Sequence, residues 1–356
     1  MQVATFAVTH HRFLDPSGRT VQPLPAFAND PETLRELYRA MVLTRTFDTK
    51  AIALQRSSRI GTYPSSLGQE AVAVGLAAAM TADDVLLPSF REHGAQLWRG
   101  VTPTEMFLYW GGDERGSDFA VPREDFPNSV PIGSQAPHAV GVALAMKLRR
   151  QPRAAVCVFG DGATSKGDVA EAMNMAGNWR APVVFVISNN RWAISVPRAA
   201  QTAAATLAQK AIAAGIPGDQ VDGNDVIAVR HVVGEALHAA RAGGGPRVVE
   251  ALTYRLSDHT TADSAKRYRD QDAVAEAWKE EPIGRLRAYL TGHGAWSDDD
   301  ECQLIDESTA RIDRAAEQYF AMEPAPPSAV FEYLYAALPK ALEGQRDEVV
   351  QGHHHG

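Results

Sequence analysis

The sequence has little cysteine and no long apolar run. Among its 356 residues the only cysteines are Cys157 and Cys302, which are too few and too far apart for a disulfide framework or a cysteine metal cluster. No segment reaches the roughly 20 apolar residues of a membrane-spanning helix. The N-terminus also lacks the charged and then apolar pattern of a secretory signal. We therefore expect a soluble, cytoplasmic protein with no membrane partner.

Basic residues are fewer than acidic ones and are scattered along the chain. The 35 Lys and Arg residues against 43 Asp and Glu residues give a net charge of −8, so we expect no nucleic-acid partner. Any anion that the protein binds must be held by local geometry. The apolar share of 45% and the charged share of 22% are those of a globular protein.

The positions of prolines and of periodic patterns predict the domain organisation. Residues 1–30 contain prolines and little periodicity, and we expect an irregular arm that packs against a neighbouring chain. A helix is predicted from Pro31, with Asp30 as its N-cap. We expect residues 31–343 to form one α/β domain. We expect residues 344–356 to form a tail, and we assign its terminal histidines no part in the site chemistry.

Two short apolar runs predict neighbouring parallel strands. They are Ala154–Phe159 and Val183–Ile187, and a helix pattern from Val169 to Ala176 lies between them. This order without polar alternation is typical of a βαβ unit in a sheet buried on both faces. The next predicted elements are a helix over 203–214, a turn over 215–218, a helix over 225–242 and a strand over 247–254. The fold class is therefore α/β, a doubly wound parallel sheet with helices on both faces, followed by a helical C-terminal region with Ser297 as an N-cap.

A glycine turn around Asp161 follows the first apolar run. Ligands in open parallel sheets bind at the carboxyl ends of the strands, so this turn is a candidate site. It is not a dinucleotide-binding fingerprint, because the next glycine after Gly162 is Gly167. It is not a P-loop either, because Asp168 stands where that motif needs lysine.

Asp161 and the segment after the second apolar run together offer oxygen ligands. Asn189 and Asn190 supply carboxamides and carbonyls, and such hard donors suit Mg²⁺ better than zinc. Mg²⁺ shares its ligand shell readily with phosphate oxygens, which the positive end of a helix predicted to begin near Ala163 also favours. Each fragment alone is more often an ordinary turn. The pair predicts a metal-bridged diphosphate site.

The spacing of the two fragments resembles the signature of thiamin-diphosphate enzymes, in which Gly160-Asp161-Gly162 is followed after 26 residues by Asn189-Asn190. Further stretches make the resemblance closer; they are 160–168, 189–195, 221–225 and 258–263 with Tyr268-Arg269. In combination they resemble the α subunit of the heterotetrameric E1 component of 2-oxo acid dehydrogenase complexes. The resemblance runs from about residue 34 to about residue 343.

This resemblance implies a set of cofactor contacts. Mg²⁺ would be held by Asp161, by the Asn190 side chain and by the Trp192 backbone carbonyl. Arg91 would hold the diphosphate, where bidentate pairing suits a guanidinium, and Ile132 would support the bent cofactor. The remaining contacts that it implies are Phe90, Gly160, Gly162, Ala163 and His259.

Two positions depart from the family pattern. Phe90 stands where the family usually has tyrosine, and it cannot donate a hydroxyl hydrogen bond. Ser188 stands where some relatives have a cation, and it supplies at most one neutral hydrogen bond. Relatives in animals have a regulatory phosphoserine at the position of Thr260, but a threonine here makes no case for that regulation.

His259 is the candidate catalytic residue. It follows a predicted strand in a polar segment with few apolar anchors, so from the residues alone a solvated loop side chain is an equal alternative. The resemblance places it near the reacting carbon, as a proton donor during acyl transfer. His93 and His138 are expected to be structural.

The resemblance also implies partners. In this family the glutamate that activates the cofactor comes from the β subunit, and this chain has no matching motif, so we expect half of an active site in an α2β2 heterotetramer. The acyl group would pass to the lipoyl group of an E2 protein. Residues 62–66 are expected to border the substrate pocket. Pyruvate is the favoured substrate, because 201–218 and Tyr63-Pro64 resemble bacterial pyruvate-type chains. Branched-chain 2-oxo acids and acetoin are alternatives.

Two hypotheses from other functional classes compete with the dehydrogenase function. The chain could be a non-catalytic α/β scaffold, but Asp161, Asn190, Arg91 and His259 are all present. It could be a Mg²⁺-dependent phosphohydrolase that uses Asp161, but residues 188–190 supply no further carboxylate.

Overall fold

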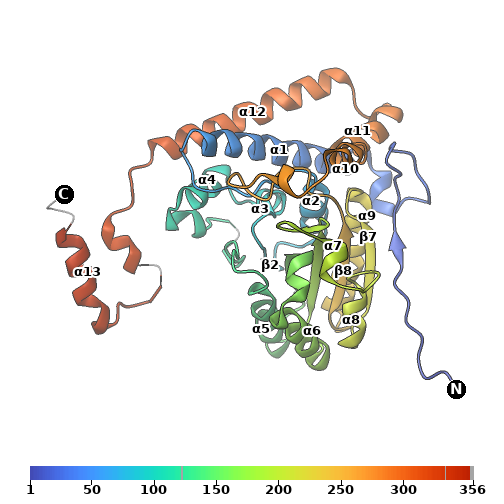
Figure 1. The fold of residues 1–356 in the computed structure, drawn as a ribbon, viewed down its shortest axis with the longest axis horizontal. Helices are drawn as coiled ribbons and strands as arrows, with labels where there is room; N and C mark the ends of the chain where they lie inside the picture. Colours follow the sequence, from blue (N-terminus) through green and yellow to red (C-terminus); the bar gives the residue numbers. More distant parts are fainter. Residues whose placement is uncertain (122, 333, 353–356) are drawn as a thin grey trace.

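A computed structural model describes residues 1–121, 123–332 and 334–352 (Figure 1). The terminal histidines, His353–His355, lie outside the described residues. The strands are β1 (His10–His11), β2 (Val85–Leu87), β3 (Ala155–Gly160), β4 (Val183–Asn189), β5 (Trp192–Ala193), β6 (Val196–Pro197), β7 (Gly218–Asp222) and β8 (Arg247–Leu252). The α-helices are α1 (Pro31–Arg56), α2 (Glu70–Ala79), α3 (His93–Arg99), α4 (Pro103–Gly111), α5 (Gln135–Leu148), α6 (Gly167–Trp179), α7 (Arg198–Gln201), α8 (Gln209–Ala213), α9 (Val226–Arg241), α10 (Gln271–Trp278), α11 (Pro282–Gly292), α12 (Asp298–Ala321) and α13 (Lys340–Gly352).

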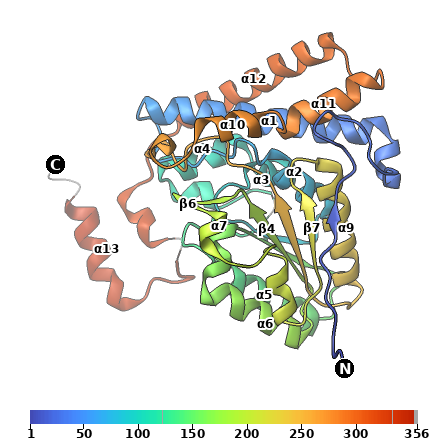
Figure 2. The same ribbon diagram turned by 45° about the vertical axis from the view of Figure 1, so that its right-hand side comes forward.

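The centre of the molecule is a parallel sheet in the order β1-β7-β8-β4-β3-β2. Successive side chains of a strand point to opposite faces, and both faces are apolar here. On β3, Val156 and Val158 pack in one core with α1, α2 and α9. Cys157 and Phe159 pack in a second core with α5 and α6. The predicted doubly wound α/β fold with helices on both faces is therefore confirmed, and Figure 2 shows α9 on the opposite side of the sheet from α5 and α6.

Local signals placed the long helices correctly. The Asp30 side chain accepts hydrogen bonds from the backbone N–H groups of Glu32 and Thr33 at the start of α1. The Ser297 side chain accepts from the Asp300 N–H at the start of α12, and the Asp300 carboxylate bonds back to the Ser297 N–H in a capping box. Both predicted N-caps are confirmed. They could be predicted from the sequence because capping depends on a few adjacent residues.

Two predictions between β4 and β8 are wrong. Residues 203–214 were predicted to form one helix, but only α8 is helical there. The predicted turn over 215–218 leads directly into β7, which the sequence did not reveal. Its residues are Gly-Asp-Gln-Val-Asp, of which only Val221 and Asp222 are buried. A strand this polar is stabilised by pairing with β8 and β1, not by an apolar pattern.

The helix expected to begin near Ala163 begins later. Asp161–Ser165 form a 3₁₀ turn, and α6 starts at Gly167.

The N-terminal segment also differs from the predicted irregular arm. His10 and His11 pair with β7, and the buried Phe13 and Leu14 donate their backbone N–H groups to the Asp225 carboxylate. This part of the segment therefore packs on its own chain.

The C-terminal part beyond α12 lies away from the sheet (Figures 1 and 2). The helix α13 has no buried residue. Its contacts are with a short 3₁₀ helix, Pro327–Phe331. Within the described ranges, none of the helices has both the length and the apolar character needed to cross a membrane.

Candidate active site

The candidate site is a cavity at the carboxyl edge of the sheet. Gly160 of β3 pairs with Ser188 of β4, so the residues that follow the two strands lie at the same level. The cavity has a volume of about 210 Å³. The structure brings all the predicted site residues together in its lining: Phe90, Arg91, Ile132, Gly160, Asp161, Gly162, Ala163, Asn190, Trp192 and His259.

Asp161 is a buried carboxylate with no cation to neutralise it. Asp161 is 1% exposed. Its Oδ2 accepts a hydrogen bond from Gln201 Nε2 at 2.6 Å. No ion pair joins it to any residue that the structure describes. Burial raises the pKa of Asp161. Because an unpaired buried charge is costly, this position favours a bound cation.

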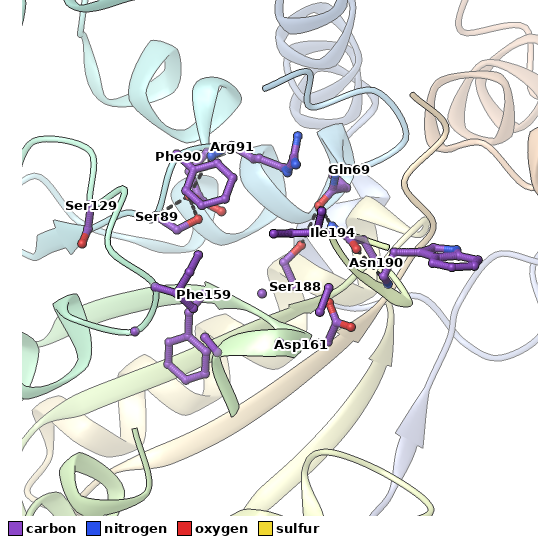
Figure 3. Close-up of a pocket in the computed structure, with 18 of the residues that line it drawn as sticks. Gln69, Ser89, Phe90, Arg91, Ser129, Phe159, Asp161, Ser188, Asn190 and Ile194 are labelled. Carbon is purple, nitrogen blue, oxygen red and sulfur yellow. Dashed lines mark hydrogen bonds between the residues drawn. The ribbon is translucent and has the colours of Figure 1, made fainter. Parts of the chain in front are cut away.

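Arg91 is the opposite case, a buried guanidinium with no carboxylate partner among the described residues. It is 6% exposed, and it donates to the Ser65 carbonyl at 2.6 Å and to the His259 carbonyl at 2.7 Å. Burial and then the nearby charge of Arg255 lower its pKa to about 10, so it remains a cation at neutral pH. In Figure 3, Arg91 and Asp161 lie on different sides of the cavity.

A tight turn positions Asn190 and Trp192. Arg191 and Ile194 have positive φ angles of 69° and 55°, which non-glycine residues rarely adopt, and the chain folds back as the β5–β6 hairpin. The hairpin packs against the glycine turn so closely that a Cβ on Gly162 would lie 2.7 Å from Ala193 Cβ. Gly162 is therefore needed for this close approach, which brings the Asp161 turn and the Asn190 turn together.

The His259 side chain is half-buried and hydrogen-bonded to Arg91, so it is not a freely solvated loop side chain. Its Nδ1 lies 2.9 Å from Arg91 Nη2. A guanidinium can only donate, so Nδ1 accepts and the ring proton sits on Nε2. Burial, followed by the charges of Arg91 and Arg255, lowers the pKa of His259 to about 4. At neutral pH the ring is therefore neutral and its Nε2–H is a donor.

The segment around His259 is anchored by polar contacts, which the sequence did not reveal. The Thr261 N–H donates to the Tyr63 carbonyl at 2.9 Å, and the Tyr63 N–H donates to Thr261 Oγ1 at 3.0 Å. Arg255 donates to the Ile194 carbonyl at 2.9 Å and to the Tyr268 hydroxyl at 2.8 Å. These contacts join the segment to the hairpin and to the chain before α2.

Residues 62–66 were expected to border the substrate pocket, but none of them lines the cavity. The Tyr63 hydroxyl lies 2.9 Å from Asp48 Oδ1 and 3.0 Å from His93 Nδ1, in the core. The segment reaches the site only through backbone groups. His93 is fully buried, as expected for a structural residue, and His138 is exposed on α5.

Three polar residues that contact the site lie outside the predicted motifs. Gln69 bonds to Ser188 and Asn190, Gln201 bonds to Asp161, and Arg255 lies beneath His259. Only Arg255 carried a usable signal, because it follows the end of β8. Across the described ranges, no three His, Cys, Asp or Glu side chains converge as a metal site. A site built from one carboxylate, one carboxamide and one carbonyl would not contain such a group.

Comparison with known proteins agrees with this fold. The family model of the dehydrogenase E1 component matches residues 38–327. The 3-methyl-2-oxobutanoate dehydrogenase subunit alpha of Mycobacterium tuberculosis is 44% identical over 322 residues, which cover 89% of this chain and 87% of the relative. The pyruvate dehydrogenase E1 component subunit alpha of Staphylococcus aureus is 39% identical over 335 residues, 94% of this chain and 90% of the relative. The corresponding subunit of Acholeplasma laidlawii is 39% identical over 338 residues, 94% and 97%.

The chain therefore belongs to the dehydrogenase E1 component family. The sequence-based assignment to the α-subunit type of that family is confirmed. Membership implies thiamin diphosphate as the cofactor.

Proposed function

We propose that this chain, assembled with a β subunit, catalyses the oxidative decarboxylation of a 2-oxo acid and transfers the acyl group to the lipoyl group of an E2 protein. One observation carries the proposal: the buried carboxylate of Asp161 and the buried guanidinium of Arg91 line the same cavity, and neither forms an ion pair with any residue that the structure describes. A Mg²⁺ ion bound to a diphosphate would satisfy both groups at once.

The donors present fit this group. Asp161, the Asn190 side-chain oxygen and the Trp192 carbonyl would hold Mg²⁺, since all are hard oxygen ligands. Arg91 would hold the diphosphate, and the glycines of the turn allow close approach to it. Ile132, which is 46% exposed at the cavity, offers an apolar support for the ring system. When bound, thiamin diphosphate supplies the carbanion that adds to the 2-oxo acid and the electron sink that remains after CO₂ leaves.

His259 would act through its Nε2–H group. Arg91 holds Nδ1 as an acceptor, so the other ring nitrogen carries the hydrogen and can donate a hydrogen bond to an oxygen of the reacting acyl group. The same contact fixes the orientation of the ring. The carboxylate that activates the cofactor would come from the β subunit.

The phosphohydrolase alternative is weaker, because it needs a second free carboxylate beside Asp161. Glu92 also lines the cavity, but its Oε2 accepts from the Ser89 N–H and Oγ, both at 2.8 Å. Its carboxylate is therefore committed to the Ser89 turn. A scaffold without a ligand would gain nothing from two unpaired buried charges.

Pyruvate is the substrate that the sequence favours. A branched-chain 2-oxo acid is the second candidate, because the relative that is 44% identical is named for 3-methyl-2-oxobutanoate. One methylene of pocket volume changes affinity by only about 1 to 3 kcal/mol, so an assay is the direct way to choose between them.

The test is reconstitution. The purified chain alone should bind thiamin diphosphate weakly and show no decarboxylation, and activity should appear when the β subunit is added. A panel of pyruvate, 2-oxoisovalerate and acetoin then ranks the substrates. Full turnover by the chain alone, shown by mass spectrometry to be free of β, would contradict the proposal that the activating carboxylate is supplied in trans.

A further inference from the structure

Gln69 reaches the candidate site from outside every motif. It occupies the N-cap position of α2, but its side chain does not cap that helix. Instead Oε1 accepts from Ser188 Oγ at 3.2 Å and from Asn190 Nδ2 at 3.1 Å. The residue is 3% exposed and lines the cavity, and Figure 3 shows it between Arg91 and Asn190.

A chain of hydrogen bonds determines which way the Gln69 amide faces. The Trp192 backbone N–H can only donate, and it lies 3.2 Å from Asn190 Oδ1. Asn190 therefore presents its NH₂ group to Gln69, and Gln69 must accept this hydrogen bond with its side-chain oxygen. The opposite orientation would place two donors against each other. Gln69 Nε2 is thus turned away from both neighbours.

Gln69 Nε2 is then a buried donor without an acceptor in the part of the chain that the structure describes. Buried polar groups in folded proteins are almost always hydrogen-bonded, and an exception needs an explanation. In the same cavity, the Arg91 guanidinium forms no ion pair with any residue that the structure describes. An anionic ligand would supply the missing acceptor.

We propose that Gln69 is a cofactor-binding residue: Nε2 donates to a diphosphate oxygen, and Oε1 holds the Asn190 amide so that the Asn190 oxygen faces away from Gln69 and can bind Mg²⁺. This inference rests on the proposed function. It gives the diphosphate a neutral donor in addition to Arg91, and this donor offsets the hydroxyl that Phe90 lacks. Gln69 also connects the start of α2 with the carboxyl end of β4, so one side chain serves both the metal ligand and the anion.

The test is calorimetric titration of the α–β assembly with thiamin diphosphate and, separately, with inorganic pyrophosphate, both in the presence of Mg²⁺. Gln69→Glu keeps an oxygen for Ser188 and Asn190 but replaces the donor with a negative charge. We expect it to bind both probes about 10- to 100-fold more weakly, as for the loss of a hydrogen bond to a charged group. Gln303→Glu, on the exposed face of α12, makes the same charge change far from the cavity and should bind as the parent does.

Gln69→Met tests the second role, the orientation of Asn190, through comparison with Gln69→Glu. It removes both polar atoms, so Asn190 loses its orientation, and half-maximal cofactor binding should require more Mg²⁺ than in the parent. Melting temperatures verify that each variant is folded, and if one fails to fold the other decides. Parent-like affinity of the folded variants for both probes would overturn the role of Gln69. If the parent assembly itself binds neither probe, the proposed function fails, and the inference fails with it.

Discussion

The cavity at the sheet edge and the C-terminal arm, defined as the described residues from Met322 to Gly352, are built in opposite ways. In the cavity even charged side chains are buried: Asp161 is 1% and Arg91 is 6% exposed. In the arm even apolar side chains are exposed: Val330 is 72% and Leu334 is 73% exposed. The cavity is held by contacts between distant segments, whereas α13 is a local helix without a core. We therefore expect single changes to matter greatly in the first region and little in the second.

The largest effect should come from Asp161→Ala. The change removes the buried charge that would bind Mg²⁺, so Mg²⁺-dependent binding of thiamin diphosphate by the assembled enzyme should be abolished. The fold should remain intact, because an unpaired buried carboxylate contributes little stability. Calorimetry and a melting curve check both points. Asp168→Ala, an exposed site seven positions along, is the matched control, and unchanged affinity of the Asp161 variant would refute the assignment.

His259→Ala should have the next largest effect. If the Nε2–H group donates a hydrogen bond that orients the reacting acyl group during transfer, acylation of the lipoyl domain should fall about 10²- to 10³-fold, as for the loss of one preorganised donor. Decarboxylation with an artificial electron acceptor bypasses the lipoyl arm and should suffer less. Cofactor affinity should change only modestly. His238→Ala, at an exposed position on α9, is the control. A parent rate of acylation would mean that His259 is only a loop residue.

Asp48→Ala probes the supports beneath the cavity. The buried Asp48 carboxylate accepts from the Ser65 hydroxyl at 2.5 Å, the Tyr63 hydroxyl at 2.9 Å and the Ser66 N–H at 2.7 Å. Its removal leaves several buried donors unpaired, so the free energy of unfolding should fall by about 2 to 3 kcal/mol. Chemical denaturation measures this. Asp313→Ala, which breaks a surface pair with Lys50, should cost at most about 1 kcal/mol. Equal losses in the two variants would remove the distinction between buried and exposed carboxylates.

The smallest effect should come from the arm. Val330→Ser, in the exposed 3₁₀ helix of the arm, should change the free energy of unfolding of the isolated chain by less than about 0.5 kcal/mol, as exposed substitutions usually do. Denaturation of the isolated chain tests this. A loss as large as that of Asp48→Ala would show that the arm has a packed core of its own, and the contrast between the two regions would disappear.

The strongly patterned parts of the fold could be predicted from the sequence. The strands β3, β4 and β8 and the helices α6 and α9 are apolar runs or periodic segments, and their predicted ranges overlap the observed ones. The strand β7 could not be predicted, because its residues are mostly polar and its partners are distant in sequence. The same contrast holds at the site. Asp161 and Asn190 could be placed because they follow predicted strands. Gln69 could not, because Ser188 lies 119 positions away from it.

The amino-acid sequence by itself determined the strongly patterned strands and helices, the caps of α1 and α12 and the two polar turns at the strand ends, because each depends on residues that are close in the chain. Only the tertiary structure decided which charges are left unpaired in the cavity, the tautomer of His259 and the orientation of the Gln69 amide. These depend on donors and acceptors that meet only when the sheet, the start of α2 and the segment after β8 are packed together. Burial then makes each unmatched donor or charge costly in free energy, and this cost favours a bound ligand in the cavity.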